Sequence, residues 1–380
     1  MVSGAPRLIF AAGGTGGHLW PALSLALAIR KIEPGAEFLF VGTGRPIEEK
    51  IIDAAGIPRV VIKSSGYKGR NFSGKVRALT DCVGGLRESL KIMKAFRPNL
   101  CFGAGGYVSV PVGVAAWLRG VPLVIYDQNS RPGLSNRFLS RLARRIFLGF
   151  TEARRYFPAD KVLVTGNPIR PEIGVLHDLR RSYRRTPLTI GVTGGSQGAS
   201  AMNRAVVPAL ISLQEAGLPF AVVHQSGEAD CDWVREQYLE AGVTAQVQPF
   251  FQDMAAYYTR TDLIIGRAGA LTISEMTAAR LPSVLVPLPT AADDHQTENA
   301  RHLVDLGAAL MLPEKDLTPE SLAVLLQGLL ENPARLDAMS QASAAAARLD
   351  VDQHMALICM GLIGLRPLGD SGLHSLSFGE

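Results

Sequence analysis

Short apolar runs that are followed by glycines recur along the whole 380-residue chain, and this recurrence constrains the fold more than any other feature. Segments with the period of a helix lie between the runs. Strands that alternate with helices of about 10 to 15 residues are typical of βαβ units in parallel sheets. The sequence therefore predicts the α/β class, with strands expected at residues 8–12, 38–41, 100–103, 123–126, 188–192, 220–224, 263–266 and 283–286.

Two of the strand ends resemble each other. Residues 9–17 read IFAAGGTGG and residues 190–198 read IGVTGGSQG, and each copy opens its own half of the chain. This pseudo-repeat predicts two doubly wound domains, expected at residues 1–165 and 166–350. Ligands of such sheets bind at the carboxyl ends of the strands, so two facing sheets would form one cleft.

The end of the chain carries one further apolar segment, residues 355–365, before Pro367. It predicts a last helix at about residues 352–366. The residues after it, 367–380, are rich in Gly, Ser and His and are expected to be frayed.

The composition excludes several classes of protein. With 47% hydrophobic and 19% charged residues the chain is neither disordered nor collagenous nor a coiled coil. Its four cysteines are widely spaced and follow no CxxC or Cys/His pattern, which excludes a disulfide scaffold and indicates a reducing compartment. We expect a cytosolic chain without a secretory leader. No apolar run approaches the roughly 18 residues of a membrane span, so an integral membrane protein is not expected.

The net charge of +5 hides an asymmetry between the halves. Residues 1–165 carry a net charge of +14 and residues 166–380 a net charge of −9. A basic half suggests nucleic acid, an anionic membrane surface or a phosphorylated substrate as partner, and the alternative is a solvated surface kept soluble by like charge.

The first glycine motif, AGGTGGH at residues 12–18, follows an expected strand. Its glycines allow a backbone to approach an anion, although a tight structural turn would also explain them. The motif is not a dinucleotide fingerprint, because Leu19 stands where the last glycine of GxGxxG, counted from Gly14, would be required. His18 has no counterpart in the second copy, where Ala199 stands. A histidine in the first turn of a helix is held near neutral and suits a general base, and the alternative is a histidine hydrogen-bonded to a loop.

Three other segments place polar residues after expected strands. Asn129 follows YDQ at residues 126–128 and could contact a sugar or peptide, or cap a turn. In RAGALTISE at residues 267–275, a helix start offers free amides to a pyrophosphate, and Glu275 offers two acceptors to a ribose diol or caps the helix. Gln296 and Asn299 share a helix face and could contact sugar hydroxyls.

Two Asp-x-Asp pairs resemble the metal-binding motif of one class of sugar transferases. They are Asp230/Asp232 and Asp350/Asp352. Neither follows an expected strand end directed at the cleft, and such pairs often arise by chance. We therefore predict no bound metal and no cofactor.

Eight segments taken together resemble the MurG family of bacterial N-acetylglucosaminyltransferases. They are AGGTGGH (12–18), GAGGYVSVP (103–111), DQN (127–129), GNPIR (166–170), GGSQGA (194–199), HQSG (224–227), RAGALTISE (267–275) and DHQTENA (294–300). The resemblance implies a GT-B fold of two Rossmann-like domains whose last helix packs back on the first domain. It also implies that the acidic half binds UDP-N-acetylglucosamine and that the basic half binds undecaprenyl-pyrophosphoryl-MurNAc-pentapeptide.

The resemblance further implies roles for individual residues. The sugar would be contacted by Thr15, Gly16, Gly17, Asn129 and Gln296. The nucleotide and its phosphates would be contacted by Arg170, Ser196, Ala270, Leu271, Thr272, Ile273 and Ser274. Glu275 would bind the ribose, and the backbone of Phe251 would recognise the uracil. Phe251 stands where many members have an aliphatic residue, and Asp127 stands where glutamate is frequent.

The implied reaction converts an α-linked sugar nucleotide into a β-1,4-linked disaccharide, by in-line attack of the muramyl 4-hydroxyl on the anomeric carbon. His18 is the expected catalytic base. Without a metal, the charge on the departing UDP would be stabilised by the helix that starts near Gly269, by Arg267 or Arg170, and by the loop of Ser196. The competing interpretations are a sugar-nucleotide epimerase on the same fold and a non-catalytic nucleotide-binding module.

The acceptor is anchored in a bilayer, so the first half is expected to contact an anionic membrane surface. Between residues 63 and 119 ten basic residues stand against two acidic ones, with apolar residues interleaved. The alternative is an ordinary basic helix face. We expect peripheral binding at the cytoplasmic face of the inner membrane, no nucleic acid, and partners among cell-wall synthesis and division proteins.

Overall fold

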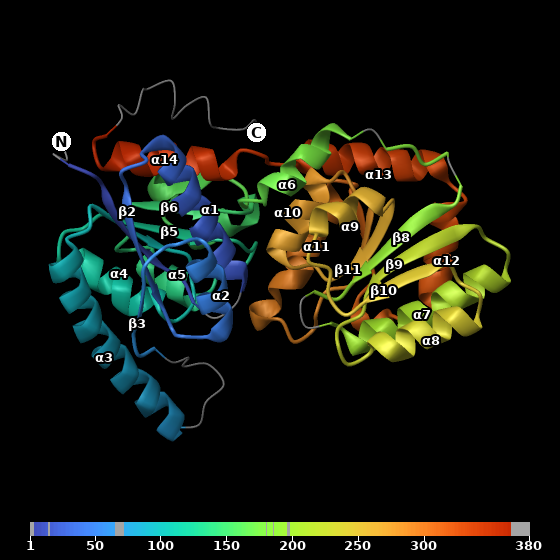
Figure 1. The fold of residues 1–380 in the computed structure, drawn as a ribbon, viewed down its shortest axis with the longest axis horizontal. Coiled ribbons are helices and arrows are strands. Elements are labelled where there is room, and N and C mark those ends of the chain that lie inside the picture. The colour runs from blue at the N-terminus through green and yellow to red at the C-terminus, as the bar shows by residue number, and fades with distance from the viewer. Residues whose placement is uncertain are drawn as a thin grey trace. The chain divides into compact units, whose positions relative to one another are not determined.

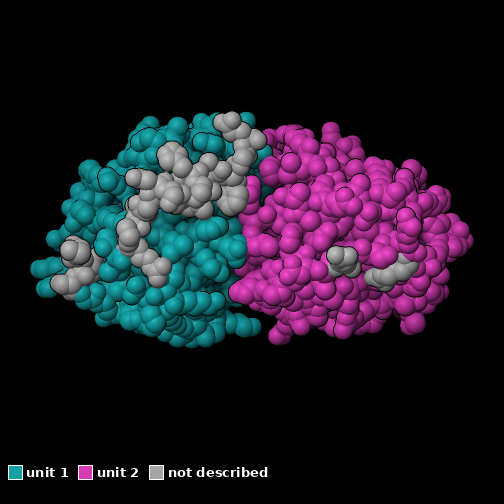
Figure 2. All heavy atoms as spheres, turned by 90° about the horizontal axis from the view of Figure 1, so that it is seen from above, with its two compact units in different colours: residues 1–168, 350–380 teal, residues 169–349 magenta. Residues whose placement is uncertain are grey.

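The protein divides into two compact units in the computed structural model (Figure 2). Unit 1 comprises Met1–Pro168 and Asp350–Glu380, and unit 2 comprises Ile169–Leu349. The structure describes residues 4–13, 16–64, 72–179, 181–184, 186–195 and 198–365, and within these it does not describe the side chains of residues 72–79 and 292.

Unit 1 is built on a parallel sheet with the strand order β3-β2-β1-β4-β5-β6-β7 (Figure 1). The strands are β1 (Arg7–Ala11), β2 (Glu37–Gly42), β3 (Arg59–Val61), β4 (Leu100–Gly103), β5 (Leu123–Asp127), β6 (Arg145–Leu148) and β7 (Val162–Val164). All six neighbouring pairs run parallel, and β1 pairs with β2 on one side and β4 on the other. The strand order reverses at β1, where doubly wound sheets bind their ligands.

Helices cover both faces of this sheet. They are α1 (Gly16–Ile32), α2 (Pro46–Ala54), α3 (Phe72–Phe96), α4 (Ser109–Leu118), α5 (Leu134–Leu139) and α14 (Val351–Leu362), with 3-10 turns η1 (Thr151–Tyr156) and η2 (Ala159–Lys161). Side chains of β1 alternate between the faces, so that Leu8 and Phe10 pack with α1 and α14, while Ile9 and Ala11 pack with α4. The last helix, α14, thus completes the core of unit 1.

Unit 2 is built on a second parallel sheet with the strand order β10-β9-β8-β11-β12-β13. The strands are β8 (Leu188–Thr193), β9 (Phe220–Gln225), β10 (Ala245–Gln248), β11 (Leu263–Gly266), β12 (Ser283–Leu285) and β13 (Ala309–Met311). The helices are α6 (Pro171–Gly174), α7 (Ser200–Glu215), α8 (Cys231–Glu240), α9 (Met254–Arg260), α10 (Ala270–Ala278), α11 (His295–Asp305), α12 (Pro319–Leu330) and α13 (Pro333–Ala346), with 3-10 turns η3 (Val175–Asp178), η4 (Ala292–Asp294) and η5 (Glu314–Asp316). The predicted α/β class with two doubly wound sheets is confirmed.

All eight expected strands are present, but five further strands were not expected: β3, β6, β7, β10 and β13. Each has only three or four residues. β3 is hard to recognise in the sequence because Val60 and Val61 are 36% and 50% exposed, and because Gly56 and Pro58 precede the strand. Among the described helices, none is both long enough and apolar enough to cross a membrane.

The burial of α14 predicts how much unit 1 depends on it. Met355 is fully buried on this helix, whereas Leu357 of the same helix is 40% exposed. We expect Met355→Ala to lower the free energy of unfolding by about 2 to 5 kcal/mol, because it leaves a cavity in the core. The matched variant Leu357→Ala should change it by less than about 1 kcal/mol. Chemical denaturation of both variants measures the difference, and equal losses would contradict the packing described here.

Candidate functional site

The loops after β1 and β4 meet at the carboxyl edge of the sheet in unit 1. Gly105 and Gly106 have φ angles of +98° and +78°, which favour glycine. A Cβ at residue 106 would lie 2.7 Å from the carbonyl oxygen of Gly13. A Cβ at residue 105 would lie 2.8 Å from His18 Cδ2 and 3.1 Å from its Nε2. The glycine loop after β1 and the GAGGYVSVP loop after β4 therefore pack backbone to backbone, with the His18 ring directly over Gly105.

The start of α1 carries the predicted residues Gly16, Gly17 and His18, all of them partly buried. Thr15 lies outside the described residues. His18 stands in the first turn of α1. The general-base role of His18 stays a prediction.

Asp127, the last residue of β5, holds the loop that contains Asn129. Its carboxylate accepts hydrogen bonds from the backbone N–H of Asn129 and of Gly133, both at 3.1 Å. It also accepts one at 2.9 Å from Asn136 Nδ2, which donates to the carbonyl of Tyr126 as well. Burial raises the pKa of the Asp127 carboxyl to about 6, although these three donors favour the charged form.

Asn136 is a residue of this site that the sequence did not reveal. It lies on α5, is 3% exposed, and its Nδ2 is 3.5 Å from the position of a Cβ at Gly105. It thereby connects the β4 loop, which carries Gly105, to Asp127 at the end of β5. No motif marks Asn136. Only its separation of nine residues from Asp127 in the sequence could have suggested that the two lie at the same edge of the sheet.

In unit 2 the segment RAGALTISE comprises the turn after β11 and the first residues of α10. Its helix begins at Ala270, and the side chains of Ala270 and Ile273 are buried in the core. Leu271, Thr272 and Ser274 are partly exposed, and the Ser274 hydroxyl donates to the carbonyl of Ala270 at 3.0 Å. The predicted contact of Ala270 with a phosphate could therefore be made only through its backbone amide, which the first turn of a helix leaves unbonded. The backbone N–H of Ile273 already donates to the carbonyl of Gly269 at 2.9 Å, so a contact of Ile273 with a phosphate would have to replace that bond.

Glu275 binds side chains rather than capping the helix. Its carboxylate accepts hydrogen bonds from Arg170 Nε at 2.8 Å and from Arg170 Nη2 at 3.0 Å. The hydroxyl of Tyr258 on α9 donates a third at 3.2 Å. The structure thus pairs two residues to which the sequence assigned separate roles, one on the ribose and one on the phosphates.

Phe251 lies at the carboxyl edge of the same sheet. Its backbone N–H donates to Gln225 Oε1 at 3.0 Å, and Gln225 Nε2 donates to the carbonyl of Gly195 at 3.0 Å. The Phe251 ring is 8% exposed and packs on Tyr257 with a centroid distance of 5.1 Å. Gln225 was not predicted as a site residue, although it belongs to the HQSG segment. Ser196 lies outside the described residues.

Gln296, Asn299 and Arg267 hold the loops after β11 and β12. Gln296 Oε1 accepts from the backbone N–H of Ala268 and of Leu288, and Asn299 Nδ2 donates to the carbonyl of Ala268. The Arg267 side chain is only 9% exposed and forms an ion pair with Glu314 at 2.5 Å. Gln296 is partly buried, whereas Asn299 is fully buried.

A buried chain of hydrogen bonds lies behind the glycine loop of unit 2. His224 Nδ1 is 3.0 Å from the Tyr238 hydroxyl, and His224 Nε2 is 3.1 Å from Asn203 Oδ1. Asn203 Nδ2 donates to the carbonyl of Ser226 and to Asp230. Burial lowers the pKa of His224 to about 3, so the ring is neutral and donates through Nε2 while Nδ1 accepts.

The Asp-x-Asp pairs are not gathered with other ligands. Asp230 accepts from Asn203, and the fully exposed Asp232 pairs with Arg235 at 2.8 Å. In the part of the chain that the structure describes, no group of three His, Cys, Asp or Glu residues could hold a metal ion.

Two family models match most of the chain. The glycosyltransferase family 28 N-terminal domain matches residues 8–148, and the glycosyltransferase family 28 C-terminal domain matches residues 189–355. The chain belongs to glycosyltransferase family 28. The N-terminal model covers β1 to β6 of unit 1, and the C-terminal model covers the strands of unit 2 and extends into α14 of unit 1.

Named relatives of this family 28 chain agree with one another. A protein of Myxococcus xanthus (strain DK1622) is 40% identical over 357 residues, which cover 94% of this chain and 93% of the relative. One of Geobacter sp. (strain M21) is 42% identical over 348 residues, which cover 91% and 94%. Both are named UDP-N-acetylglucosamine–N-acetylmuramyl-(pentapeptide) pyrophosphoryl-undecaprenol N-acetylglucosamine transferase.

Solved structures support the same conclusion. Acinetobacter baumannii MurG is similar with a TM-score of 0.78 at 33% identity, covering 94% of this chain and 99% of the other. The predicted resemblance to the MurG family and the predicted GT-B fold are confirmed. A UDP-GlcNAc 2-epimerase from Neisseria meningitidis has a TM-score of 0.65 at 12% identity, with coverages of 93% and 99%, and shares the fold alone.

The raised pKa of Asp127 predicts a change of stability with pH. Below the usual pKa of 3.8 the carboxyl is protonated in both the folded and the unfolded state. As the pH rises to about 6, the unfolded chain loses this proton first, so the free energy of unfolding falls and then levels off. Chemical denaturation over this range should show a smaller fall for Asp127→Asn than for the unchanged chain. Asp53→Asn, at an exposed carboxylate paired with Arg59, is the control. It should show the same fall in the free energy of unfolding as the unchanged chain.

The buried chain in unit 2 predicts unequal effects of two tyrosine substitutions. Tyr238→Phe removes the partner of His224 Nδ1 and should lower the free energy of unfolding by about 1 to 3 kcal/mol. Tyr257 is equally buried, but its hydroxyl has no hydrogen-bond partner among the described residues. Tyr257→Phe should therefore cost less than about 0.5 kcal/mol. Thermal or chemical unfolding compares them, and equal costs would argue against the chain of hydrogen bonds.

Proposed function

We propose that this chain transfers N-acetylglucosamine from UDP-N-acetylglucosamine to undecaprenyl-pyrophosphoryl-MurNAc-pentapeptide, with inversion at the anomeric carbon. The observation that carries this function is the 40% identity, over 94% of the chain, to a relative named for that transfer. The assignment places the chain in peptidoglycan synthesis, at the step that completes the lipid-linked disaccharide.

The donor is proposed to bind at the carboxyl edge of the sheet in unit 2. The first-turn amides of α10 would bind the diphosphate, and Glu275 would bind the ribose diol. A carboxylate offers about four acceptor positions, and Arg170 and Tyr258 fill three of them. Two ribose hydroxyls therefore need at least one donor to leave. Arg170 is the group expected to turn away, because its guanidinium can bind the diphosphate instead.

The base of the donor is proposed to lie against Phe251. The backbone N–H of Phe251 is bonded to Gln225, so recognition of uracil through this amide would require Gln225 to turn. The Phe251 carbonyl could accept a hydrogen bond without that change. Gln296 is proposed to close over the sugar with its amide N–H groups, and the unplaced Thr15 and Ser196 remain predicted contacts.

The acceptor is proposed to react at the carboxyl edge of the sheet in unit 1. His18 would take the proton of the muramyl 4-hydroxyl as that oxygen attacks the anomeric carbon. Gly16, Gly17 and Asn129 would contact the sugars, and Asp127 with Asn136 would keep the Asn129 loop in place. Glycine at residue 105 lets the His18 ring approach the β4 loop.

The leaving UDP is proposed to need no metal ion. Its negative charge would be met by the α10 amides, by Arg170 and by the loop of Ser196. One helix start contributes about 0.3 to 2 kcal/mol, so these groups must act together. The Arg267 guanidinium is held by Glu314 and by two backbone carbonyls, and its contribution would be that of a fixed charge.

Peripheral binding to the cytoplasmic face of the inner membrane is proposed from the lipid anchor of the acceptor and the basic charge of residues 1–165. In the basic stretch predicted for this role, Lys68 and Arg70 lie outside the described residues. Lys75 and Arg77 belong to α3, but their side chains are not described. Partners among cell-wall synthesis and division proteins remain a prediction.

One assay distinguishes this function from an epimerase and from a nucleotide-binding module. The purified chain is incubated in detergent with UDP-N-acetylglucosamine and a short-chain lipid acceptor, with and without EDTA. We expect the lipid-linked disaccharide and UDP in both samples. Conversion of the sugar nucleotide without the acceptor would indicate epimerisation, and bound but unchanged nucleotide would indicate a binding module.

The role of His18 predicts a loss of turnover without a loss of donor binding. We expect His18→Ala to lower turnover by about 10² to 10⁴, the usual contribution of a general base. The dissociation constant for UDP-N-acetylglucosamine, measured by calorimetry, should change little. His354→Ala, on α14, is the control for removal of an imidazole from unit 1 and should keep normal turnover. Normal turnover of His18→Ala would remove this residue from the mechanism.

A further inference from the structure

Gln225 ends β9 in the middle of three neighbouring strands of unit 2. In the strand order β10-β9-β8, it is in register with Thr193 on β8 and with Gln248 on β10. The chain continues from β8 into the glycine loop that begins at Gly194, and from β10 to Phe251. Gln225 is 3% exposed. It therefore lies buried beside both a loop predicted to contact a diphosphate and a residue predicted to contact uracil.

The side-chain amide of Gln225 joins these two neighbours through three hydrogen bonds. Its Oε1 accepts from the backbone N–H of Phe251 at 3.0 Å. Its Nε2 donates to the carbonyl of Gly195 at 3.0 Å and to the Thr193 hydroxyl at 3.2 Å. A backbone N–H can only donate and a carbonyl can only accept, so the reversed orientation of the amide would break the bonds at both ends. Gln225 thus bridges the loop after β8 and the segment after β10 in one defined orientation.

The Gly195 end of this bridge stabilises a tight turn. Gly195 has a φ angle of +86°, and its carbonyl also accepts from the backbone N–H of Gly198 at 3.2 Å. Its own N–H donates to the Thr193 hydroxyl at 3.3 Å. Ser196, a predicted contact of the diphosphate, lies between Gly195 and Gly198 in the sequence. The bond from Gln225 therefore holds the residue at which the predicted diphosphate loop begins its turn.

The residue before Gln225 fixes the end of β9 from the other face of the sheet. Successive side chains of a strand point to opposite faces, and His224 is bonded there to the Tyr238 hydroxyl and to Asn203. Asn203 Nδ2 donates in turn to the carbonyl of Ser226, the residue after Gln225. The backbone on both sides of Gln225 is therefore held in place, which gives its bridge a rigid origin.

We propose that Gln225 is a positioning residue for the donor, which holds the diphosphate loop at a fixed distance from the segment that meets the base. The proposal rests on the donor site proposed above and assigns Gln225 no contact with the reacting atoms. A nucleoside diphosphate must engage both places at once, and loops that are already ordered lose less conformational freedom when it binds. Binding of uracil to the Phe251 carbonyl leaves the bridge intact.

The variant Gln225→Glu tests the bridge, because the protonation of its carboxyl changes one end only. A protonated carboxyl, like the amide, can accept from the Phe251 N–H and donate to the Gly195 carbonyl. A carboxylate can still accept from Phe251 but has no proton to donate to Gly195. Burial raises the pKa of a carboxyl, so the protonated form should persist above the usual range of a glutamate. The variant therefore loses the Gly195 bond only as the pH rises.

The affinity of the full chain for UDP is measured by calorimetry from pH 5 to pH 9, and that for uridine by competition with UDP. Each value is compared with that of the unchanged chain at the same pH. We expect Gln225→Glu to bind UDP almost normally at pH 5 and at least about fivefold more weakly at pH 9. Uridine has no diphosphate, so its affinity should change little. The control Gln246→Glu, at an exposed residue of β10, should match the unchanged chain at every pH.

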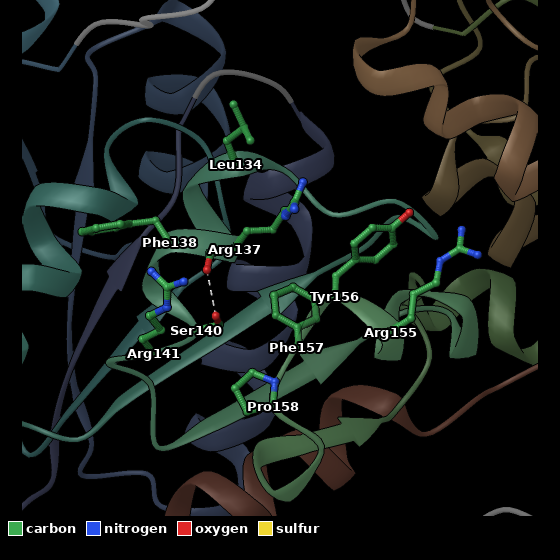
Figure 3. A pocket seen from close by; sticks show the side chains of 9 residues that line it. All are labelled: Leu134, Arg137, Phe138, Ser140, Arg141, Arg155, Tyr156, Phe157 and Pro158. Atoms are coloured by element: carbon green, nitrogen blue, oxygen red, sulfur yellow. Dashed lines mark hydrogen bonds between the residues drawn. The ribbon is translucent and has the colours of Figure 1, made fainter.

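A second control shows where UDP binds, because UDP is an anion. Unit 1 has a pocket of about 580 Å³ that is lined by Arg137, Arg141 and Arg155 and by no acidic residue (Figure 3). Arg137→Gln/Arg155→Gln removes two of these charges and should leave the affinity for UDP unchanged. A loss would place the UDP site in unit 1, and the donor site proposed in unit 2 would be wrong together with the role of Gln225.

Two results would overturn the role of Gln225 while the unchanged chain still binds UDP in unit 2. A UDP affinity of Gln225→Glu that matches the unchanged chain at every pH would mean that the bond to Gly195 does not serve the donor. Equal losses for UDP and uridine would mean a general disturbance of this edge of the sheet. No binding of UDP to the unchanged chain would count against the donor site itself.

A neutral variant keeps the test decisive if Gln225→Glu unfolds as the pH rises, which circular dichroism would show. Gln225→Met has a side chain of similar length that can neither donate to Gly195 nor accept from Phe251 in the same way. We expect it to weaken the binding of UDP by at least about fivefold at every pH and the binding of uridine much less. An unchanged affinity for UDP would overturn the proposal.

Discussion

Close backbone packing at the carboxyl ends of neighbouring parallel strands is the constraint on which the rest of the site depends. In unit 1 the β1 and β4 loops approach so closely that a side chain at Gly106 would collide with the carbonyl of Gly13. In unit 2 a Cβ at Gly198 would lie 2.8 Å from the carbonyl of Ser226. At both edges glycine lets two loop backbones approach each other more closely than a side chain would allow.

Polar side chains behind these edges hold the loops that glycine leaves free to move. Asp127 and Asn136 do this in unit 1, and Gln225, Gln296 and the chain from Tyr238 to Asn203 do it in unit 2. Most are buried, and each satisfies backbone groups that regular secondary structure leaves unpaired. The two glycine-rich halves are thus alike in their loops and different in the side chains that support them.

The sequence by itself determined the α/β class, eight of the thirteen described strands, the two glycine loops and the family. Those features are local, because an apolar run with a glycine after it, or a helix start such as Gly269 and Ala270, lies within a few consecutive residues. Only the tertiary structure decided that Arg170 pairs with Glu275, 105 residues away, and that Asn136, Gln225 and Asn203 belong to the edges. A hydrogen bond between distant residues leaves no pattern in the chain. Its two partners come within about 3 Å only after the sheets align their strand ends.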